Sequence, residues 1–407
     1  MNNDSSFGYI RSMMRTATSR GWMACAINMR GQGGVELTTP RAYNAGFTGD
    51  LRGVILQLEK RLVRSTTTER RSGRRRSDTR GNANENKNKN ENENDATKSA
   101  NPTNPDNNND GYDDDDDVIH QGGPIFLLGY SLGANIITKY LGEESLHGTL
   151  PKCIAGGAAM GNPLHIHSGS IAFPWNMVLA AGIKRSILQN YKTLKQFREP
   201  GYQTAVKKAL MSPTIAQLDD TFSRYLIRNE GKPPYEMKLG YDGGGEEYWR
   251  DASSHRYVAH VSVPLLKISA QDDFLVFGQF AKKLNYCLEN PNVIVVKTRC
   301  GGHLGWQESP PPSPSGNCDN KGRGLFGGSG SWSDVAVADF IEALLQIRGE
   351  DREEKKKKKR MMERVVGGYY HDVDDGGDDD ESTTIRNEGH ALNNSYSPRQ
   401  PKILSRL

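Results

Sequence analysis

A short apolar strand that runs directly into a Gly-x-Ser-x-Gly turn and a helix constrains this 407-residue chain more than any other feature. Residues 124–128 (PIFLL) are typical of a buried parallel strand. The turn follows at residues 129–133 (GYSLG). Apolar residues then recur at three- and four-residue spacing, which predicts a helix: Ala134, Ile136, Ile137, Tyr140 and Leu141. The pattern favours an α/β fold built on a mostly parallel, doubly wound sheet.

A serine at such a turn is held on a tight elbow, with a strained backbone and an exposed hydroxyl. We expect glycine at Gly129 and Gly133, because side chains there would clash with the neighbouring strand and helix. Tyr130 is the other residue of the elbow before the serine. The N–H of Leu132 would point at a tetrahedral oxyanion. Ser131 is therefore the candidate nucleophile and Leu132 the candidate oxyanion donor.

A serine becomes nucleophilic when a histidine takes its proton and a carboxylate orients that histidine. In this fold the chain order is serine, acid, histidine. Residues 264–269 predict a strand that runs into Asp272 and Asp273, and residues 293–296 predict a strand that leads to His303. The carboxyl ends of parallel strands gather at one edge of the sheet. We favour Asp273 as the acid, with Asp272 as the fallback, and His303 as the base.

Each of these residues also has a structural interpretation. The two aspartates could cap a helix predicted at residues 277–288, and His303 could be a turn residue among glycines. Three residues in the required order and setting favour the catalytic interpretation. Seven other histidines lack a suitable acid, fall outside the required order or lie in polar segments: His120, His165, His167, His255, His260, His371 and His390.

Seven short motifs together resemble the AB-hydrolase-4 group of α/β-hydrolases: residues 30–34 (RGQGG), 37–41 (LTTPR), 43–46 (YNAG), 50–52 (DLR), 129–135 (GYSLGAN), 269–273 (SAQDD) and 301–305 (GGHLG). The group includes YheT-type esterases, embryogenesis-associated proteins, medium-chain acyl-ester synthases/esterases and lipid hydrolases. The resemblance covers residues 8–60 and 123–349. It implies a serine hydrolase of carboxylic esters (acylglycerols, phospholipids or short- and medium-chain acyl esters) that works through an acyl-serine intermediate and needs no cofactor. By match, Ser131, Asp273 and His303 form its triad.

The chain departs from the group at three places. Phe47 stands where the group usually has histidine, and Phe274 where it often has proline. The group also has strands and a His-Gly-type loop, which supplies a second oxyanion N–H, before the helix matched here by residues 9–19. Without the third strand, the fourth strand, at residues 22–28, lacks its neighbours. We therefore expect a truncated reading of a longer gene, with a non-catalytic relative as the alternative.

Composition divides the chain into two core segments, an insertion and a tail. Residues 1–60 are expected to form the N-terminal part of the core, and residues 123–349 the rest, with a helical cap at about 163–260 after strand six. Residues 61–122 and 350–407 combine charge runs with a polar low-complexity tract, so they cannot bury apolar surface and are expected to be disordered. The apolar stretch at residues 171–183 suits either an acyl chain or packing of cap on core. Four cap aromatics could line the entrance: Tyr235, Tyr241, Tyr248 and Trp249.

The chain carries 53 basic and 49 acidic residues, a net charge of +4, so nucleic acid is not an expected partner. The expected partner is a small-molecule lipid or acyl-ester substrate; contact with a membrane surface stays open. The five cysteines are odd in number and scattered, which favours reduced thiols in an intracellular compartment. Cys300 and His303 have a metal-like spacing but no partner pair, so no metal site is expected.

No apolar run reaches the roughly 18 to 20 residues that span a bilayer, and the N-terminus is not a signal peptide. A lost N-terminal anchor would make the protein membrane-associated. The final residues, Ser405, Arg406 and Leu407, are a conservative variant of the Ser-Lys-Leu peroxisomal signal. Three alternatives to ester hydrolysis stay open: acyl transfer to an alcohol, a non-catalytic scaffold and, least favoured, nucleic-acid binding.

Overall fold

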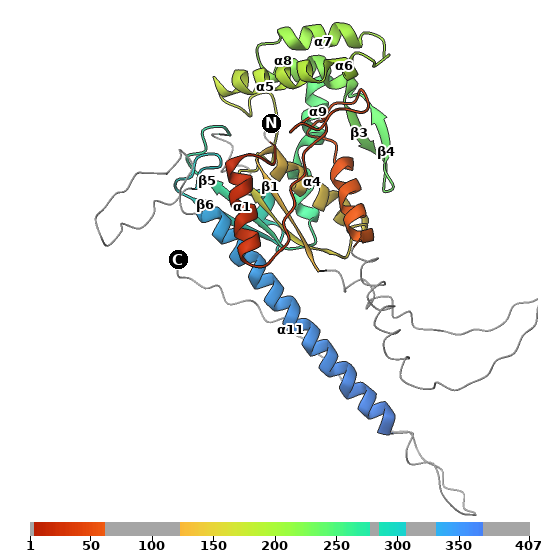
Figure 1. The fold of residues 1–407 in the computed structure, drawn as a ribbon, viewed down its shortest axis with the longest axis vertical. Helices are drawn as coiled ribbons and strands as arrows, with labels where there is room; N and C mark the ends of the chain where they lie inside the picture. The colour runs from red at the N-terminus through yellow and green to blue at the C-terminus, as the bar shows by residue number, and fades with distance from the viewer. Residues whose placement is uncertain (1–3, 62–122, 277–284, 307–330, 369–407) are drawn as a thin grey trace, which may run out of the picture. The chain divides into compact units, whose positions relative to one another are not determined.

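The computed structural model describes residues 4–61, 123–276, 285–306 and 331–368 (Figure 1). The chain divides into two compact units, Met1–Ile347 and Arg348–Leu407. Several predictions concern residues outside the described ranges. These are the insertion at residues 62–122, most of the helix predicted at 277–288, the tail beyond residue 368 and the tripeptide at 405–407.

A four-stranded parallel sheet forms the centre of the first unit, in the order β1-β2-β5-β6. Its strands are β1 (Ile125–Tyr130), β2 (Ile154–Met160), β5 (Leu265–Ala270) and β6 (Val293–Thr298). Every residue of β2 and β5 is buried, as expected for parallel strands that are covered on both faces. The predicted α/β class with a parallel sheet is confirmed.

Helices cover the two faces of the sheet, and the side chains of the strands alternate between them. On one face, Leu127 and Ala159 join a core with α4 (Leu132–His147) and a helix over residues 49–61. On the other face, Met160 and Ile268 join a second core. That core also contains Met13 of α1 (Gly8–Ser19) and Val337 and Ile341 of α11 (Trp332–Gly368).

The chain between β2 and β5 forms a separate helical layer with one hairpin (Figure 1). Its elements are α5 (Trp175–Gln189), α6 (Tyr191–Leu194), α7 (Tyr202–Met211), α8 (Ile215–Phe222), η2 (Ser223–Tyr225), β3 (Ile227–Glu230), β4 (Glu236–Leu239), α9 (Gly244–Ala252), η3 (Ser254–Arg256) and η4 (Val258–His260). The hairpin strands β3 and β4 are antiparallel. We refer to this insertion after β2 as the cap.

The strand predicted at residues 22–28 is wrong. Residues 22–29 have no regular secondary structure, and Met23 is 99% exposed. A strand is held by hydrogen bonds to a neighbour. β1 is the edge of the sheet, and no strand within the described ranges lies beyond it. The extended segment therefore has no partner with which to form a ladder.

The disorder predicted for residues 350–407 is wrong for the part that the structure describes. Residues 350–368 are helical and end α11. Lysine, arginine, glutamate and methionine are all good helix formers. Ion pairs at helical spacing, Glu353 with Lys356 and Glu354 with Lys358, add to this preference. Within the described ranges, no helix combines the length and the apolar character that crossing a membrane requires.

Candidate active site

Ser131 lies between β1 and α4, on a backbone that most residues avoid. Its φ of 52° and ψ of −118° place a non-glycine residue at positive φ, which is strained. The Ser131 N–H donates to the Met160 carbonyl at 2.8 Å, so the neighbouring strand β2 supports the turn. The sharp elbow expected from Gly-x-Ser-x-Gly is present.

The two glycines of the elbow differ in what they allow. A Cβ at Gly129 would lie 2.5 Å from the Gly133 carbonyl oxygen and 2.6 Å from the Ala134 nitrogen. The first turn of α4 therefore packs so closely on residue 129 that only glycine fits at that position. A Cβ at Gly133 would meet no atom within 4 Å outside its own helix, among the residues that the structure describes. The predicted clash is therefore correct for Gly129 and wrong for Gly133, whose Cβ direction is open. Tyr130, the residue before the serine, packs against α1, with its ring centroid 4.8 Å from that of Tyr9.

The structure brings Ser131, His303 and Asp273 into one hydrogen-bonded chain. His303 Nε2 lies 2.7 Å from Ser131 Oγ, and His303 Nδ1 lies 2.8 Å from Asp273 Oδ2. Asp273 and His303 are buried, with 5% and 9% of their surface exposed. With the proton on Nδ1, the imidazole donates to Asp273 and its Nε2 can accept the serine proton. The arrangement can deliver a serine nucleophile.

Asp273 is fixed through its second carboxylate oxygen. Asp273 Oδ1 accepts hydrogen bonds from the N–H groups of Leu275 at 3.0 Å and Val276 at 3.2 Å. Asp273 therefore binds two backbone N–H groups with one oxygen and His303 with the other; the start of the helix that it was expected to cap lies outside the described residues. The backbone turn after β5 holds the carboxylate toward His303.

Asp272, the fallback acid, has a separate role that sequence reasoning missed. Its carboxylate accepts hydrogen bonds from the N–H groups of Gly302 at 2.8 Å and Gly301 at 3.4 Å. It thus ties the end of β5 to the loop that carries His303. In the sequence, the signal was the second acid, Asp272, together with the glycine pair before His303. The backbone of glycine can approach a carboxylate closely because glycine has no side chain.

The His303 loop also packs against the end of β2. A Cβ at Gly161, where φ is +59°, would lie 2.6 Å from the His303 carbonyl oxygen. On the far side of the loop, Trp306 Nε1 donates to Thr298 Oγ1 at 2.9 Å. The histidine is therefore positioned by the ends of three strands, β2, β5 and β6.

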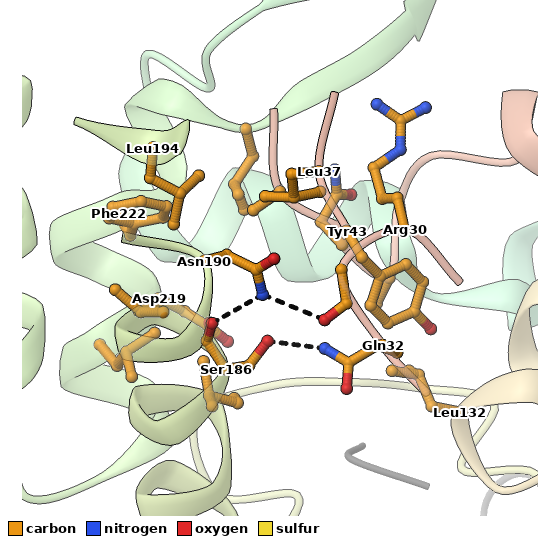
Figure 2. Close-up of a pocket in the computed structure, with 18 of the residues that line it drawn as sticks. Arg30, Gln32, Leu37, Tyr43, Leu132, Ser186, Asn190, Leu194, Asp219 and Phe222 are labelled. Atoms are coloured by element: carbon orange, nitrogen blue, oxygen red, sulfur yellow. Dashed lines mark hydrogen bonds between the residues drawn. The ribbon is translucent and has the colours of Figure 1, made fainter. Parts of the chain in front are cut away.

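A pocket lies next to the elbow, between residues 30–45 and the cap helices α5 and α8 (Figure 2). Its walls are mostly apolar: Leu37, Ala42, Ala45, Leu132, Ile183, Ile187, Leu194, Leu218, Phe222 and Leu226. Gln32 Nε2 donates to Ser186 Oγ at 2.7 Å, and Asn190 Nδ2 donates to the Gly31 carbonyl at 3.0 Å. These bonds tie the loop after residue 29 to the cap (Figure 2). Leu132 joins the pocket to the serine turn.

Asp219 is an ionisable side chain that lines this pocket. It is 9% exposed, and its Oδ2 accepts a hydrogen bond from Trp249 Nε1 at 2.9 Å. Burial raises the pKa of Asp219 to about 7, and the Trp249 hydrogen bond offsets only part of that increase. The carboxyl therefore changes charge near neutral pH.

Comparison with known proteins finds similar lipases and an embryogenesis-associated protein. A monoacylglycerol lipase of Saccharomyces cerevisiae is 22% identical over 308 residues, covering 73% of this chain and 51% of the yeast protein. The embryogenesis-associated protein EMB8 of Picea glauca is 23% identical over 356 residues, covering 84% and 57%. The chain thus spans about half the length of the curated relatives it matches.

The chain has an α/β fold with a parallel sheet, and it is similar to these relatives at low identity. No model of a known protein family matches it. Among solved structures, the esterase Pf2001 of Pyrococcus furiosus is similar at 13% identity, with a TM-score of 0.32, covering 72% of this chain and 68% of the esterase.

Other residues singled out in the sequence lie outside the triad. Tyr241 and Trp249 are buried and do not line the pocket, whereas Tyr248 is buried and does line it. The Tyr241 hydroxyl donates to Asp251 Oδ2 at 2.7 Å. The His165 ring contacts two other histidine rings and does not join the triad. Its centroid lies 5.3 Å from that of His167, edge-on, and 4.4 Å from that of His255, at a tilt.

The apolar stretch at residues 171–183 is divided between two environments. Ile183 lines the pocket, whereas Phe173 is 76% exposed and Val178 is 55% exposed. The described cysteines are free thiols: Cys25, Cys153, Cys287 and Cys300. Within the described ranges, no group of three or more histidine, cysteine or acidic side chains could hold a metal ion.

Proposed function

We propose that this chain is an α/β-hydrolase that cleaves carboxylic esters of lipids through an acyl-serine intermediate, with Ser131 as nucleophile, His303 as base and Asp273 as the orienting acid. The observation that carries the proposal is the unbroken hydrogen-bonded chain from Ser131 Oγ through the imidazole to Asp273. The strained backbone at Ser131 supports it.

In the proposed reaction, Ser131 Oγ attacks the ester carbonyl carbon while its proton passes to His303 Nε2. The tetrahedral oxyanion accepts a hydrogen bond from the Leu132 N–H at the start of α4. Collapse of this intermediate breaks the bond to the alcohol oxygen, which takes the proton from His303. Water then attacks the acyl-serine by the same steps, and the acid product leaves.

The proposed substrates are acylglycerols, phospholipids or short- and medium-chain acyl esters. The apolar pocket beside Leu132 supports an alkyl chain as part of the ligand. The yeast relative that matches this chain is named a monoacylglycerol lipase. Both observations point to an ester with a lipid-like chain.

The exposed apolar side chains near Asp273 support contact with aggregated lipid as part of this function. Trp175 packs its ring 4.9 Å from that of Phe274, the residue after the acid. Phe173, Met177 and Val178 are exposed in the same segment of the cap. Soluble proteins rarely expose such groups together unless they meet an apolar partner.

Labelling with a fluorophosphonate tests the proposal, because the reagent forms a covalent bond only with an activated serine. We expect labelling of the chain at Ser131 and none in Ser131→Ala. His303→Gln and Asp273→Asn should lower ester hydrolysis by about three to six orders of magnitude. Absence of labelling in a folded sample would favour the non-catalytic scaffold.

Added ethanol or glycerol separates hydrolysis from acyl transfer, since both pass through the same acyl-enzyme. Free acid as the main product is the expected result. Transfer of most acyl groups to the added alcohol would assign the protein as an acyltransferase instead.

A further inference from the structure

The pocket contains a buried acid with unused hydrogen-bonding capacity. In the described part of the chain, Asp219 has one hydrogen bond, from Trp249 to Oδ2, and no ion pair. Its other oxygen belongs to a side chain that lines the pocket. A buried polar group without a partner costs free energy, which a ligand could recover.

Several neighbouring polar side chains already have hydrogen-bond partners within the protein. Asn44 Nδ2 donates to the Ile227 carbonyl at 3.0 Å, and Asn44 Oδ1 accepts from the Gly46 N–H. Arg30, the cation that lines the pocket, donates from Nε to Asp50 at 2.8 Å. Gln32, Ser186 and Asn190 bond as described above. Asp219 is therefore the acid left to meet a ligand.

We propose that this pocket binds an ester with a free hydroxyl group on one of its chains, and that Asp219 recognises that hydroxyl. The inference rests on the proposed function and deepens it by naming a specificity-determining residue. A hydroxyl both donates and accepts, so it bonds to the carboxylic acid and to the carboxylate alike. Apolar walls around a single acid suit a neutral chain with one polar group better than a cation.

The hydroxyl can come from either side of the ester. It can belong to the alcohol, as in a monoacylglycerol, or to a hydroxylated acyl chain. The chemistry that Asp219 recognises is the same in both cases, so paired probes must distinguish the two sources.

Calorimetric binding to Ser131→Ala tests this without turnover. For the alcohol side, the probes are 1-O-octylglycerol and octyl propyl ether; for the acyl side, they are methyl 10-hydroxydecanoate and methyl decanoate. We expect the hydroxylated member of one pair to bind about 2- to 10-fold more tightly, the range of one neutral hydrogen bond. That pair identifies the source of the hydroxyl.

Two further variants assign the preference to Asp219. In Ser131→Ala with Asp219→Asn, the amide can still donate and accept, so the preference should persist. In Ser131→Ala with Asp219→Leu, the two members of the pair should bind about equally tightly, because leucine cannot form the hydrogen bond. Equal binding within both pairs, or a preference that survives Asp219→Leu, would overturn the proposal. The proposal would also be overturned if octylammonium bound more tightly than every hydroxylated probe and if its affinity increased above pH 7.

The role of Asp219 and the proposed catalytic function can be rejected independently of each other. Fluorophosphonate labelling depends on Ser131, His303 and Asp273, whereas the hydroxyl preference is measured in Ser131→Ala and depends on Asp219. Loss of labelling with an intact hydroxyl preference would reject catalysis alone. Normal labelling without any hydroxyl preference would reject the role of Asp219 alone.

Discussion

Asp272 and Asp273 are adjacent in the chain after β5, yet their carboxylates have different partners. Asp273 contacts His303, and Asp272 bonds to the backbone of the loop that carries His303. Both residues lie in the turn after β5, so the shape of that turn sets the direction of each side chain. The two carboxylates therefore hold the same histidine in two ways, one through its ring and one through its loop.

Removing the Asp272 anchor should slow the reaction without abolishing it. Asp272→Ala leaves the N–H groups of Gly301 and Gly302 without this acceptor, so His303 is held less accurately. We expect kcat for a p-nitrophenyl ester to fall by about 100-fold, with KM little changed. Asp272→Asn keeps an acceptor oxygen and should lose less. A kcat for Asp272→Ala as low as that of Asp273→Asn would contradict the division of roles.

Asp219 should make stability depend on pH in a direction opposite to that of an ion-paired acid. Burial raises its pKa to about 7 in the folded protein, whereas an aspartate in the unfolded chain has a pKa of about 3.9. Between these values the folded state holds a proton that the unfolded state has released. The free energy of unfolding therefore falls as pH rises from about 4 to 7, by up to about 4 kcal/mol.

Asp219→Asn removes this titration. Relative to the unaltered protein, the variant should gain stability as pH rises from 4 to 8, which urea unfolding at both pH values measures. Asp220→Asn is the matched control, because that neighbouring carboxylate is exposed. A stability difference between Asp219→Asn and the unaltered chain that stays constant over this range would contradict the prediction.

At the scale of elements, the helix after the elbow is anchored by buried charges. Lys139 of α4 donates to Asp251 of α9, to the carbonyl at 2.6 Å and to Oδ1 at 2.8 Å, and lies 3.2 Å from Glu143. Arg52, from the helix over residues 49–61, pairs with Glu144 at 2.5 Å. The network joins α4 to the cap and to a second helix on the same face of the sheet.

Lys139→Met should destabilise the protein by about 3 to 5 kcal/mol, because it leaves Asp251 and Glu143 without their shared cation in a buried site. Chemical denaturation measures the change. Lys207→Met on α7 is the control, since this lysine is exposed on its helix and should change stability by less than about 0.5 kcal/mol. A loss for Lys139→Met no larger than that of the control would show that the network contributes little.

At the scale of the whole molecule, the sheet was predictable because its signals are local. The apolar runs that predicted strands lie within a few residues of the observed β1, β5 and β6. Because these strands are parallel, the carboxyl ends of β1, β5 and β6 lie at one edge of the sheet, where Ser131, Asp273 and His303 meet. The segment at residues 22–28 shows the limit, since a strand also needs a neighbour.

The pocket was beyond sequence reasoning because its walls come from distant segments. Residues 30–45, Leu132 and the helices α5 and α8 form it jointly (Figure 2). Asp219 carried no recognisable motif, and burial by the assembled cap is what sets its pKa. The same holds for Tyr241 and Trp249, which the fold buries.

The amino-acid sequence alone determined the fold class, the serine turn and the order of the three residues that meet around His303, because each depends on short-range patterns and on the direction of parallel strands. Tertiary structure decided which aspartate faces the histidine, which residues surround the pocket and which acid is buried there. Those outcomes depend on packing between segments that lie far apart in the chain, and packing is a property of the assembled protein.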